Sequence, residues 1–353
     1  TEKQGADTHL EYTVIPWVTM QNLATKMTGV VMCILSLKLY FSDSMPLLSC
    51  IMMMVASFMV YESLDSMSSF TALMRNINIA VTKTKEILDM PPMDIDGAEI
   101  EPLKRDIELR NVGFSYDKKK IIDDVSLRIP EKTTTAFVGP SGGGKTTLCH
   151  LMARFWDVQE GEVFLGGKNV KDYSFDSLMK NFSFVFQSVY LFEDTIANNI
   201  RFGEPEASME RVIEAAKKAK CHDFIMSLPD GYETIIGEGG ASLSGGEKQR
   251  ISIARAIMKD APIIILDEAT ANVDPENETE LTAAIEALTK EKTIIMIAHR
   301  LKTVRHADQI FVIDNGHIAE KGTHDDLMKQ EGIYKSFVEG RQEAASWKIA
   351  ASA

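Results

Sequence analysis

The chain has 353 residues and a formal net charge of −13 at pH 7. This length is more than one modest domain needs, so two domains are predicted. A surface this acidic is poorly suited to neutralising the phosphates of DNA or RNA, so we expect no nucleic-acid partner. The four cysteines form neither a C-x-x-C pair nor a metal-binding spacing, which indicates reduced thiols.

Two apolar segments near the N-terminus predict a pair of helices. Residues 46–61 carry no charge and are apolar on every side of a helix, which indicates a membrane-spanning segment or a buried core helix. Residues 18–41 are similar but are interrupted by two lysines, and the polar turn at residues 42–44 joins the two segments. Basic residues follow the second segment: Arg75, Lys83 and Lys85. Together these features favour a transmembrane hairpin whose basic side faces the cytoplasm.

The second helix is predicted to continue beyond the membrane boundary. After residue 61 its apolar residues keep spacings of three and four, and no helix breaker occurs before Pro91. A helix over residues 46–88 would be about 64 Å long, roughly twice the thickness of the hydrocarbon core of a bilayer, and should extend into the cytoplasm. Residues 89–97 are acidic and contain two prolines and a glycine, which predicts a linker and a domain boundary near residue 100.

A phosphate-binding loop is the strongest motif in the chain. Residues 133–138 indicate a buried strand, and the sequence GPSGGGKTT follows directly, before a helical stretch. This order is the context of a P-loop, whose backbone N–H groups surround phosphate oxygens at the start of a helix; a glycine-rich turn with an incidental lysine is the alternative. In a P-loop, Lys145 supplies a positive charge and Thr146 offers its hydroxyl to Mg²⁺. The predicted nucleotide-binding residues of the loop are Gly139, Ser141, Gly142, Gly143, Gly144, Lys145, Thr146 and Thr147.

A second buried strand is predicted at residues 263–266, where four aliphatic residues occur without alternation, as in a central parallel strand. It ends in Asp267 and Glu268. A carboxylate at the tip of a strand beside the P-loop strand is where the partner of Mg²⁺ is expected, so Asp267 is the predicted metal ligand. Glu268 would reach the attacking water and act as the catalytic base. An Asp-Glu pair after an apolar run is common on its own, so both assignments depend on the P-loop.

The sequence LSGGEKQR at residues 243–250 opens a predicted helix. Ser244, Gly245 and Gly246 would leave N–H groups at its N-terminus that suit an anion; a plain helix cap with a Gly-Gly turn is the alternative. With this signature sequence, residues 107–337 resemble the nucleotide-binding domain of an ABC transporter. The resemblance implies ATP and Mg²⁺ as cofactors and ATP hydrolysis as the activity.

The resemblance assigns roles to further residues that match. Tyr116 would stack on adenine, although a strand-end tyrosine beside a solvated turn is the alternative. Gln187 would touch Mg²⁺ and the attacking water and would relay the state of the site to the membrane helices; the alternative is a buried structural amide. His299, which follows a predicted strand, would contact the γ-phosphate, whereas an isolated histidine at a strand end usually serves packing.

Two further loops match the family less closely. Asp274 matches the aspartate of the D-loop, which crosses to the partner subunit, although this chain has Ala-Asn-Val-Asp where Ser-Ala-Leu-Asp is commoner. The same residue, placed before Pro275, also fits a helix N-cap. Residues 237–240 resemble the loop that contacts the coupling helices of the membrane domain in exporter-type members; an ordinary glycine turn is the alternative.

The chain as a whole is similar to the C-terminal part of an exporter-fold half-transporter. The predicted fold is an α/β P-loop NTPase, namely an ABC ATPase domain with an α-helical subdomain, preceded by an all-α transmembrane hairpin. The predicted regions are a partial transmembrane domain at 1–90, a linker at 91–106, the nucleotide-binding domain at 107–340 and a C-terminal tail at 341–353. Such halves carry six membrane helices, so we expect a fragment or a truncated product.

The resemblance also implies how the protein works. Two nucleotide-binding domains would pack head to tail, with each ATP between the P-loop of one chain and the signature of the other. The expected partners are a second half-transporter, as a homodimer or heterodimer, membrane lipid and a transported small molecule. The location would be the cell (inner) membrane, multi-pass, with the ATPase domain in the cytoplasm. The alternatives are a soluble ABC ATPase of DNA repair or translation and a nucleotide-binding regulator without hydrolysis. The cargo stays open between a siderophore system and a drug, lipid or peptide exporter.

Overall fold

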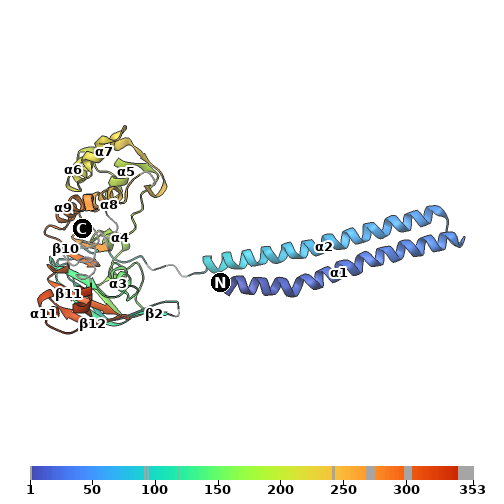
Figure 1. Ribbon diagram of the computed structural model, residues 1–353, viewed down its shortest axis with the longest axis horizontal. Helices are drawn as coiled ribbons and strands as arrows, with labels where there is room; N and C mark the ends of the chain where they lie inside the picture. Colours follow the sequence, from blue (N-terminus) through green and yellow to red (C-terminus); the bar gives the residue numbers. More distant parts are fainter. Residues whose placement is uncertain are drawn as a thin grey trace, which may run out of the picture. The chain divides into compact units, whose positions relative to one another are not determined.

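The computed structural model describes residues 2–90, 93, 95–117, 119–240, 243–267, 275–297 and 304–340. The chain forms two units, Thr1–Pro92 and Met93–Ala353 (Figure 1). The first unit is helical, and the second combines strands and helices.

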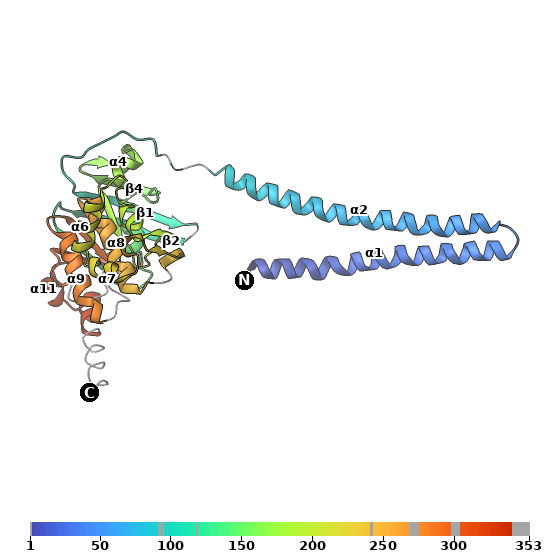
Figure 2. The same cartoon turned by 90° about the horizontal axis from the view of Figure 1, so that it is seen from above.

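The first unit is a hairpin of two long antiparallel helices, α1 (Glu2–Phe41) and α2 (Leu47–Leu88) (Figure 2). In the turn between them, Asp43 adopts a left-handed conformation with φ of 56°, and the N–H of Ser44 donates to the carbonyl oxygen of Leu39 at 3.1 Å. The continuous helix predicted over residues 46–88 is confirmed by α2. The first helix is longer than predicted, because α1 begins well before residue 18.

Small side chains line the contact between α1 and α2. The buried residues of this contact are Gly29 and Ser36 on α1 and Cys50 and Ser57 on α2. The two residues on each helix are seven positions apart, which is the spacing of side chains that face a partner helix. The two serine hydroxyls donate to the carbonyl oxygens one turn earlier in their own helices, at 2.7 and 2.8 Å, so they do not bridge the helices.

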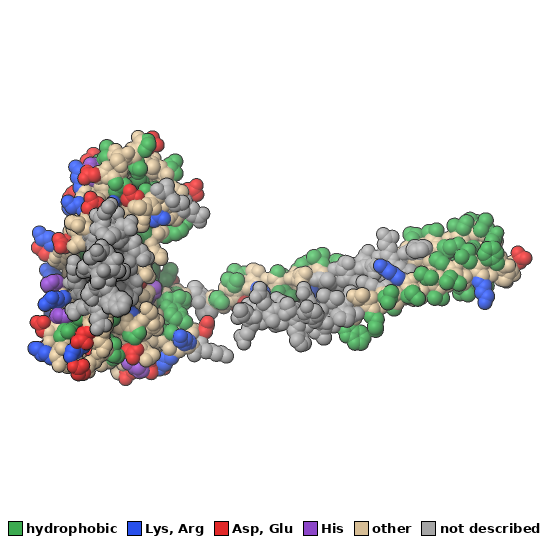
Figure 3. Space-filling model, viewed as in Figure 1, with side chains coloured by type: hydrophobic (Ala, Val, Ile, Leu, Met, Phe, Trp, Pro, Cys, Tyr) green, Lys and Arg blue, Asp and Glu red, His purple; other side chains and the backbone are tan. Residues whose placement is uncertain are grey.

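Large apolar side chains lie on the outside of this hairpin, as Figure 3 shows near the turn. They include Val30, Ile34, Leu48, Ile51 and Val55, each of which is about half exposed or more. Where its side chains are described, the hairpin therefore has small residues inside and large apolar residues outside, the reverse of a helix pair that folds in water. Among the described residues, no helix combines the length and the apolar character needed to cross a membrane.

A six-stranded sheet forms the centre of the second unit. Five strands run parallel, and β12 pairs antiparallel at one edge. In spatial order the strands are β12 (His317–Gly322), β11 (Gln309–Asp314), β3 (Thr134–Val138), β10 (Thr293–Ile297), β9 (Ile263–Asp267) and β6 (Phe182–Val185). Strand β9 is aliphatic without alternation because both faces are buried: Ile263 and Ile265 face one core, and Ile264 and Leu266 face the other.

An antiparallel sheet covers one of these cores. Its strands, in spatial order, are β2 (Lys119–Ile129), β1 (Ile107–Tyr116), β4 (Glu160–Leu165) and β5 (Lys168–Asn169). Their inward side chains share a core with α3 (Lys145–Met152) and with one face of the six-stranded sheet. Helix α3 is thereby held between two sheets, which fixes the position of the loop that precedes it.

A helical layer packs on the other core. One of its members, α8 (Gly245–Lys259), packs against β6 and several helices. The other helices of this layer are α5 (Ile196–Arg201), α6 (Met209–Lys218), α7 (His222–Ser227), α9 (Pro275–Thr289) and α11 (His324–Met328). Helix α4 (Phe175–Met179) instead places Leu178 in the core beneath the antiparallel sheet. The short elements are η1 (Val170–Asp172), η2 (Gly231–Glu233), η3 (Glu238–Gly240), β7 (Asp194–Thr195) and β8 (Ile235–Ile236). The predicted α/β fold with a helical part is confirmed.

The segment before β1 packs against the second unit. The N–H of Ala98 donates to the carbonyl oxygen of Asp172 at 2.8 Å. The N–H of Ser174 donates to the carbonyl oxygen of Ala98 at 2.7 Å. A Cβ on Gly97 would lie 2.1 Å from the carbonyl oxygen of Tyr173, so no larger residue fits this close approach. Part of the stretch from residue 91 to 106 is therefore fixed to the domain that follows it.

Candidate nucleotide-binding site

The loop between β3 and α3 depends on glycine at three positions with positive φ: Gly139 (134°), Gly142 (79°) and Gly144 (106°). A Cβ on Gly139 would lie 2.1 Å from the carbonyl oxygen of Ile313, and one on Gly144 would lie 2.7 Å from Cδ1 of Ile122. Conformation disfavours a side chain at all three positions, and space also excludes one at Gly139 and Gly144. The loop leads directly into the N-terminus of α3, the end of a helix that suits an anion.

The turn between β11 and β12 supports this loop from behind. The N–H of Gly316 donates to the carbonyl oxygen of Gly143 at 3.2 Å, and the N–H of Asp123 donates to that of Gly316 at 3.0 Å. The sequence analysis missed this support. The dipeptide Asn315-Gly316 indicates a turn, but nothing in the sequence indicates that the turn contacts a loop more than 170 residues earlier.

Lys145 is the first residue of α3 and is only 6% exposed. Its Nζ donates to the carbonyl oxygens of Gly139, at 3.1 Å, and Pro140, at 2.8 Å. The ammonium group thus lies inside the ring of the loop that it belongs to. In this position it places a positive charge where phosphate oxygens would meet the loop.

Asp267 and Thr146 meet at the same edge of the sheet. Ile297 of β10 pairs with Asp267 on one side and with Phe137 of β3 on the other, so Asp267 ends level with the strand that leads into the loop. Oγ1 of Thr146 donates to Oδ2 of Asp267 at 3.3 Å. A hydroxyl and a carboxylate are oxygen ligands of the kind that Mg²⁺ prefers, so these two residues fit a magnesium ion beside bound phosphates.

The predicted loop residues differ in exposure. Ser141, Gly142 and Thr146 are exposed, whereas Gly143, Gly144, Lys145 and Thr147 are buried. Behind the loop, burial raises the pKa of the Cys149 thiol, and the charge of Asp267 acts in the same direction. Burial lowers the pKa of His150, although Asp267 opposes the shift. Both side chains are therefore neutral at pH 7, and Lys145 carries the positive charge of this part of α3.

Gln187 lies at the same edge of the sheet as Asp267. Val185, the last residue of β6, pairs with Leu266, and Gln187 follows two residues later as an exposed side chain. The neighbouring Phe186 is bound to α8, because Nε2 of Gln249 donates to its carbonyl oxygen at 3.4 Å. The sequence analysis did not identify Gln249, although it lies within the signature sequence.

The signature sequence forms a capped helix N-terminus. Ser244 is the N-cap of α8: its Oγ accepts from the N–H of Glu247, and the Glu247 carboxylate accepts from the N–H of Ser244 at 2.8 Å. Gly245 is exposed and Gly246 is buried. Helix α8 packs against α5, α6, α9 and β6, whereas α3 packs against β2, β4 and β10. The signature and the phosphate loop thus belong to different parts of the second unit.

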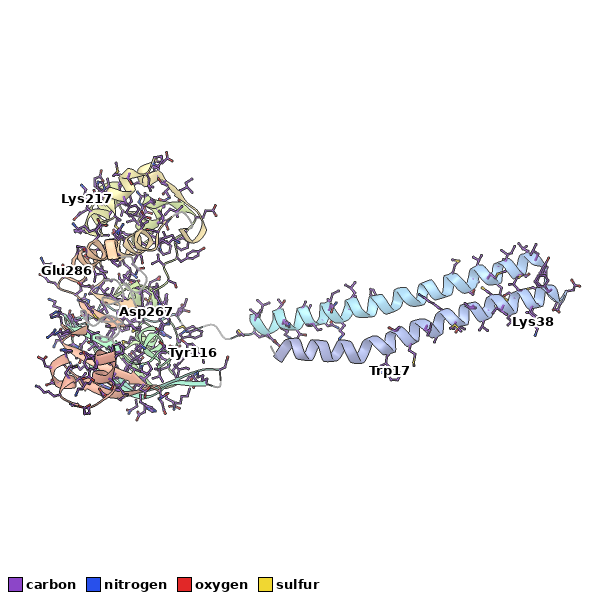
Figure 4. All side chains as sticks on the ribbon, viewed as in Figure 1. Trp17, Lys38, Tyr116, Lys217, Asp267 and Glu286 are labelled. Atoms are coloured by element: carbon purple, nitrogen blue, oxygen red, sulfur yellow. The ribbon has the colours of Figure 1, made fainter. Side chains whose placement is uncertain are left out.

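The other predicted residues divide into two groups. Tyr116 ends β1 and is 37% exposed; Figure 4 shows it and Asp267 in the same unit. Glu268, Asp274 and His299 lie outside the described residues. Strand β9 ends directly before Glu268, and β10 ends two residues before His299.

Residues 122–271 match the family model described as ABC transporter. These residues belong to the ABC transporter family. The match includes residues 139–147, residues 243–250 and Asp267.

The chain is similar to proteins that are named as transporters. The chain is 43% identical over 284 residues to the ATP-dependent lipid A-core flippase of Syntrophus aciditrophicus, covering 80% of this chain and 47% of that protein. It is 45% identical over 271 residues to ABC transporter B family member 2 of Dictyostelium discoideum, covering 74% of this chain and 19% of that protein. The chain therefore spans less than half the length of these relatives.

A solved structure shares the fold. The structure of a bacterial Atm1-family ABC exporter with ATP bound aligns with a TM-score of 0.69 and 31% identity, covering 92% of this chain and 58% of that chain. Because the alignment covers most of this chain, it extends beyond the residues matched by the family model.

The first prediction concerns nucleotide affinity. Lys145→Met should weaken ATP binding about 10- to 100-fold, because a hydrogen bond to a charged group is lost at the phosphates. Calorimetric titration of the full chain with ATP measures this. Lys168→Met, at an exposed position on β5, is the control and should bind as the wild type does. Unchanged affinity in a folded Lys145→Met chain would contradict the assignment.

Proposed function

We propose that this chain is the ATP-hydrolysing part of an ABC exporter and couples ATP-driven association of two such domains to transport across a membrane. The observation that carries this proposal is the meeting of Thr146 with Asp267 beside the buried amine of Lys145, within residues matched to the ABC family. These groups suit a triphosphate and its magnesium ion. The named relatives are a flippase and an exporter, which favours outward transport over the siderophore alternative.

In the proposed reaction, water attacks the γ-phosphorus of ATP and ADP leaves. Mg²⁺, when bound, would neutralise part of the negative charge of the phosphates. Thr146, Asp267 and Gln187 would hold the ion. Glu268 accepts the proton of the attacking water, and His299 contacts the γ-phosphate. The lysine charge and the loop N–H groups keep the phosphates in place.

Each complete site is proposed to lie between two chains. Within one chain, the signature helix and α3 have different packing partners, so a second half-transporter would supply Ser244, Gly245 and Gly246 to the ATP on this chain. The N–H groups of Gly245 and Gly246 are the ones that suit a phosphate, because those of Ser244 and Glu247 already bond within the cap. Asp274 is proposed to cross the same interface.

Contacts on both sides of Gln187 support its proposed role as a relay. Gln249 of α8 donates to the carbonyl oxygen of Phe186. Arg255 lies six residues further along the same helix, and its Nη1 donates to the carbonyl oxygen of Tyr190 at 2.7 Å. Nε of Arg255 also donates to the carbonyl oxygen of Asn199 on α5 at 2.6 Å. The segment with Gln187 is thus attached to the signature helix at two points, so a displacement of one should move the other.

The helical hairpin is proposed to lie in a membrane. Its large apolar side chains are exposed while glycine, serine and cysteine occupy the contact between the helices. Close packing through small residues suits helices surrounded by lipid, where burial of apolar groups between helices brings no gain. Residues 1–90 would then form part of the membrane domain, with residues 107–340 as the nucleotide-binding domain in the cytoplasm and 341–353 as its tail.

The alternative of a soluble ABC ATPase acting on DNA or ribosomes has less support. A net charge of −13 disfavours nucleic acid, and an exposed apolar hairpin has no role in such a protein. A regulator without hydrolysis would be favoured by loss of Glu268 or His299, and the sequence retains both residues.

Replacement of the proposed base tests the enzymatic proposal. Glu268→Gln should leave ATP binding intact and slow hydrolysis by roughly 10²- to 10⁴-fold, because the amide cannot accept the proton. Phosphate release by the chain, assembled with its partner in lipid, is the measurement. Glu286→Gln, at an exposed position on α9, is the matched control. If Glu268→Gln hydrolyses ATP at the wild-type rate, Glu268 is not the catalytic base.

A second experiment tests the membrane proposal. Ile51→Arg combined with Val55→Arg places two charges on the exposed face of α2 and should cost about 2.5 kcal/mol or more per residue in lipid. We expect a large loss of chain from membranes washed at alkaline pH. The control Asp43→Arg, in the turn, should stay with the membrane. Equal retention of the double variant and the wild type would show that this face does not lie in lipid.

A further inference from the structure

Three aromatic side chains form a cluster that includes Tyr116, the residue predicted to stack on adenine. Tyr116 contacts Phe114 edge to face, with ring centroids 4.9 Å apart and planes at 89°. It contacts Trp156 in the same way, at 5.5 Å and 85°. Phe114 and Trp156 also touch, at 6.3 Å. Such edge-to-face pairs fix the orientation of each ring.

The three rings differ in exposure. Phe114 is 4% exposed, whereas Tyr116 is 37% and Trp156 is 49% exposed. Phe114 therefore forms the base of the cluster, and the other two rings are open to a ligand. The open rings of Tyr116 and Trp156 are nearly perpendicular and make an aromatic corner.

The segments that carry the two open rings are tied together. Gln159 accepts from the N–H of Ser115 at 2.9 Å and donates to the carbonyl oxygen of Ser115 at 3.0 Å. This pair of bonds holds the residue between Phe114 and Tyr116 against the segment that carries Trp156. The corner is therefore fixed by the backbone and not only by ring contacts.

The tryptophan is also fixed on its own segment. Nε of the buried Arg154 donates to Oδ1 of Asp157 at 2.9 Å, which closes a tight turn around Trp156. Phe155 packs against His150 and Phe184, so it turns inward. Helix α3 begins with Lys145 of the phosphate loop and ends at Met152, four residues before Trp156.

We propose that Trp156 is the second wall of a two-walled aromatic corner that binds the base of the nucleotide, with Tyr116 as the first wall. This inference rests on the proposed function of the site. The corner has two flat apolar surfaces, so it recognises the size and shape of the base. A purine stacked on one ring reaches the other, and a pyrimidine fills the corner less completely. The site should therefore prefer purine over pyrimidine triphosphates and accept both ATP and GTP.

Binding of four probes to the full chain tests this proposal: ATP, GTP, CTP and inorganic tripolyphosphate. Trp156→Ala should weaken ATP and GTP by roughly three- to tenfold, in line with the worth of one aromatic contact to a base. Tripolyphosphate has no base, so its affinity should not change, and the preference for ATP over CTP should shrink. Trp156→Phe should restore most of the affinity, and Trp17→Ala on α1 is the control.

Trp156 also provides a direct optical readout. The chain has three tryptophans, so Trp17→Phe and Trp347→Phe together leave Trp156 as the single fluorophore. ATP should shield it from quenching by acrylamide, and tripolyphosphate should not. Equal quenching with and without ATP would overturn the proposal, as would an equal loss of ATP and tripolyphosphate affinity in Trp156→Ala. A wild-type chain that binds neither probe would instead overturn the proposed nucleotide site.

Discussion

A buried ammonium group needs hydrogen-bond acceptors around it, and Lys145 finds them in the carbonyl oxygens of Gly139 and Pro140, which belong to its own loop. This arrangement requires the chain to curl around the amine. It explains the glycines with positive φ, the close approach of Gly139 to Ile313, and the supporting bond from Gly316. The conformation of the loop is thus stabilised by contacts within the protein itself.

The sheet around the loop brings the other groups to the same edge. Parallel register places Asp267 level with the end of β3, which lets Thr146 reach it. The helical layer carries the signature sequence on α8. Through Gln249 it also contacts the segment around Gln187. A single chain therefore has the loop around Lys145 and, separately, the capped helix α8. In the proposed two-chain site, the loop of one chain and the capped helix of the other contact the same ATP.

Local patterns predicted much of this structure from the sequence. The loop, α2, and strands β3 and β9 each depend on a short run of residues, so periodicity and motif spacing were sufficient. The contacts that were missed join distant residues: Gly316 to Gly143, Gln159 to Ser115, and Trp156 to Tyr116. A pairing across 40 or more residues leaves no local signal. The small residues between α1 and α2 were also missed, because only the pairing of the helices shows which side is buried.

The central claim is that one chain's phosphate loop works with another chain's signature. Co-assembly of Lys145→Met and Ser244→Asp chains in lipid tests it most directly, since aspartate can still cap α8 but repels phosphate. Each variant alone should be inactive. The mixture should recover about a quarter of wild-type ATP hydrolysis, because half of randomly paired dimers are mixed and each of these has one intact site of two. A mixture as inactive as its separate components would contradict the claim.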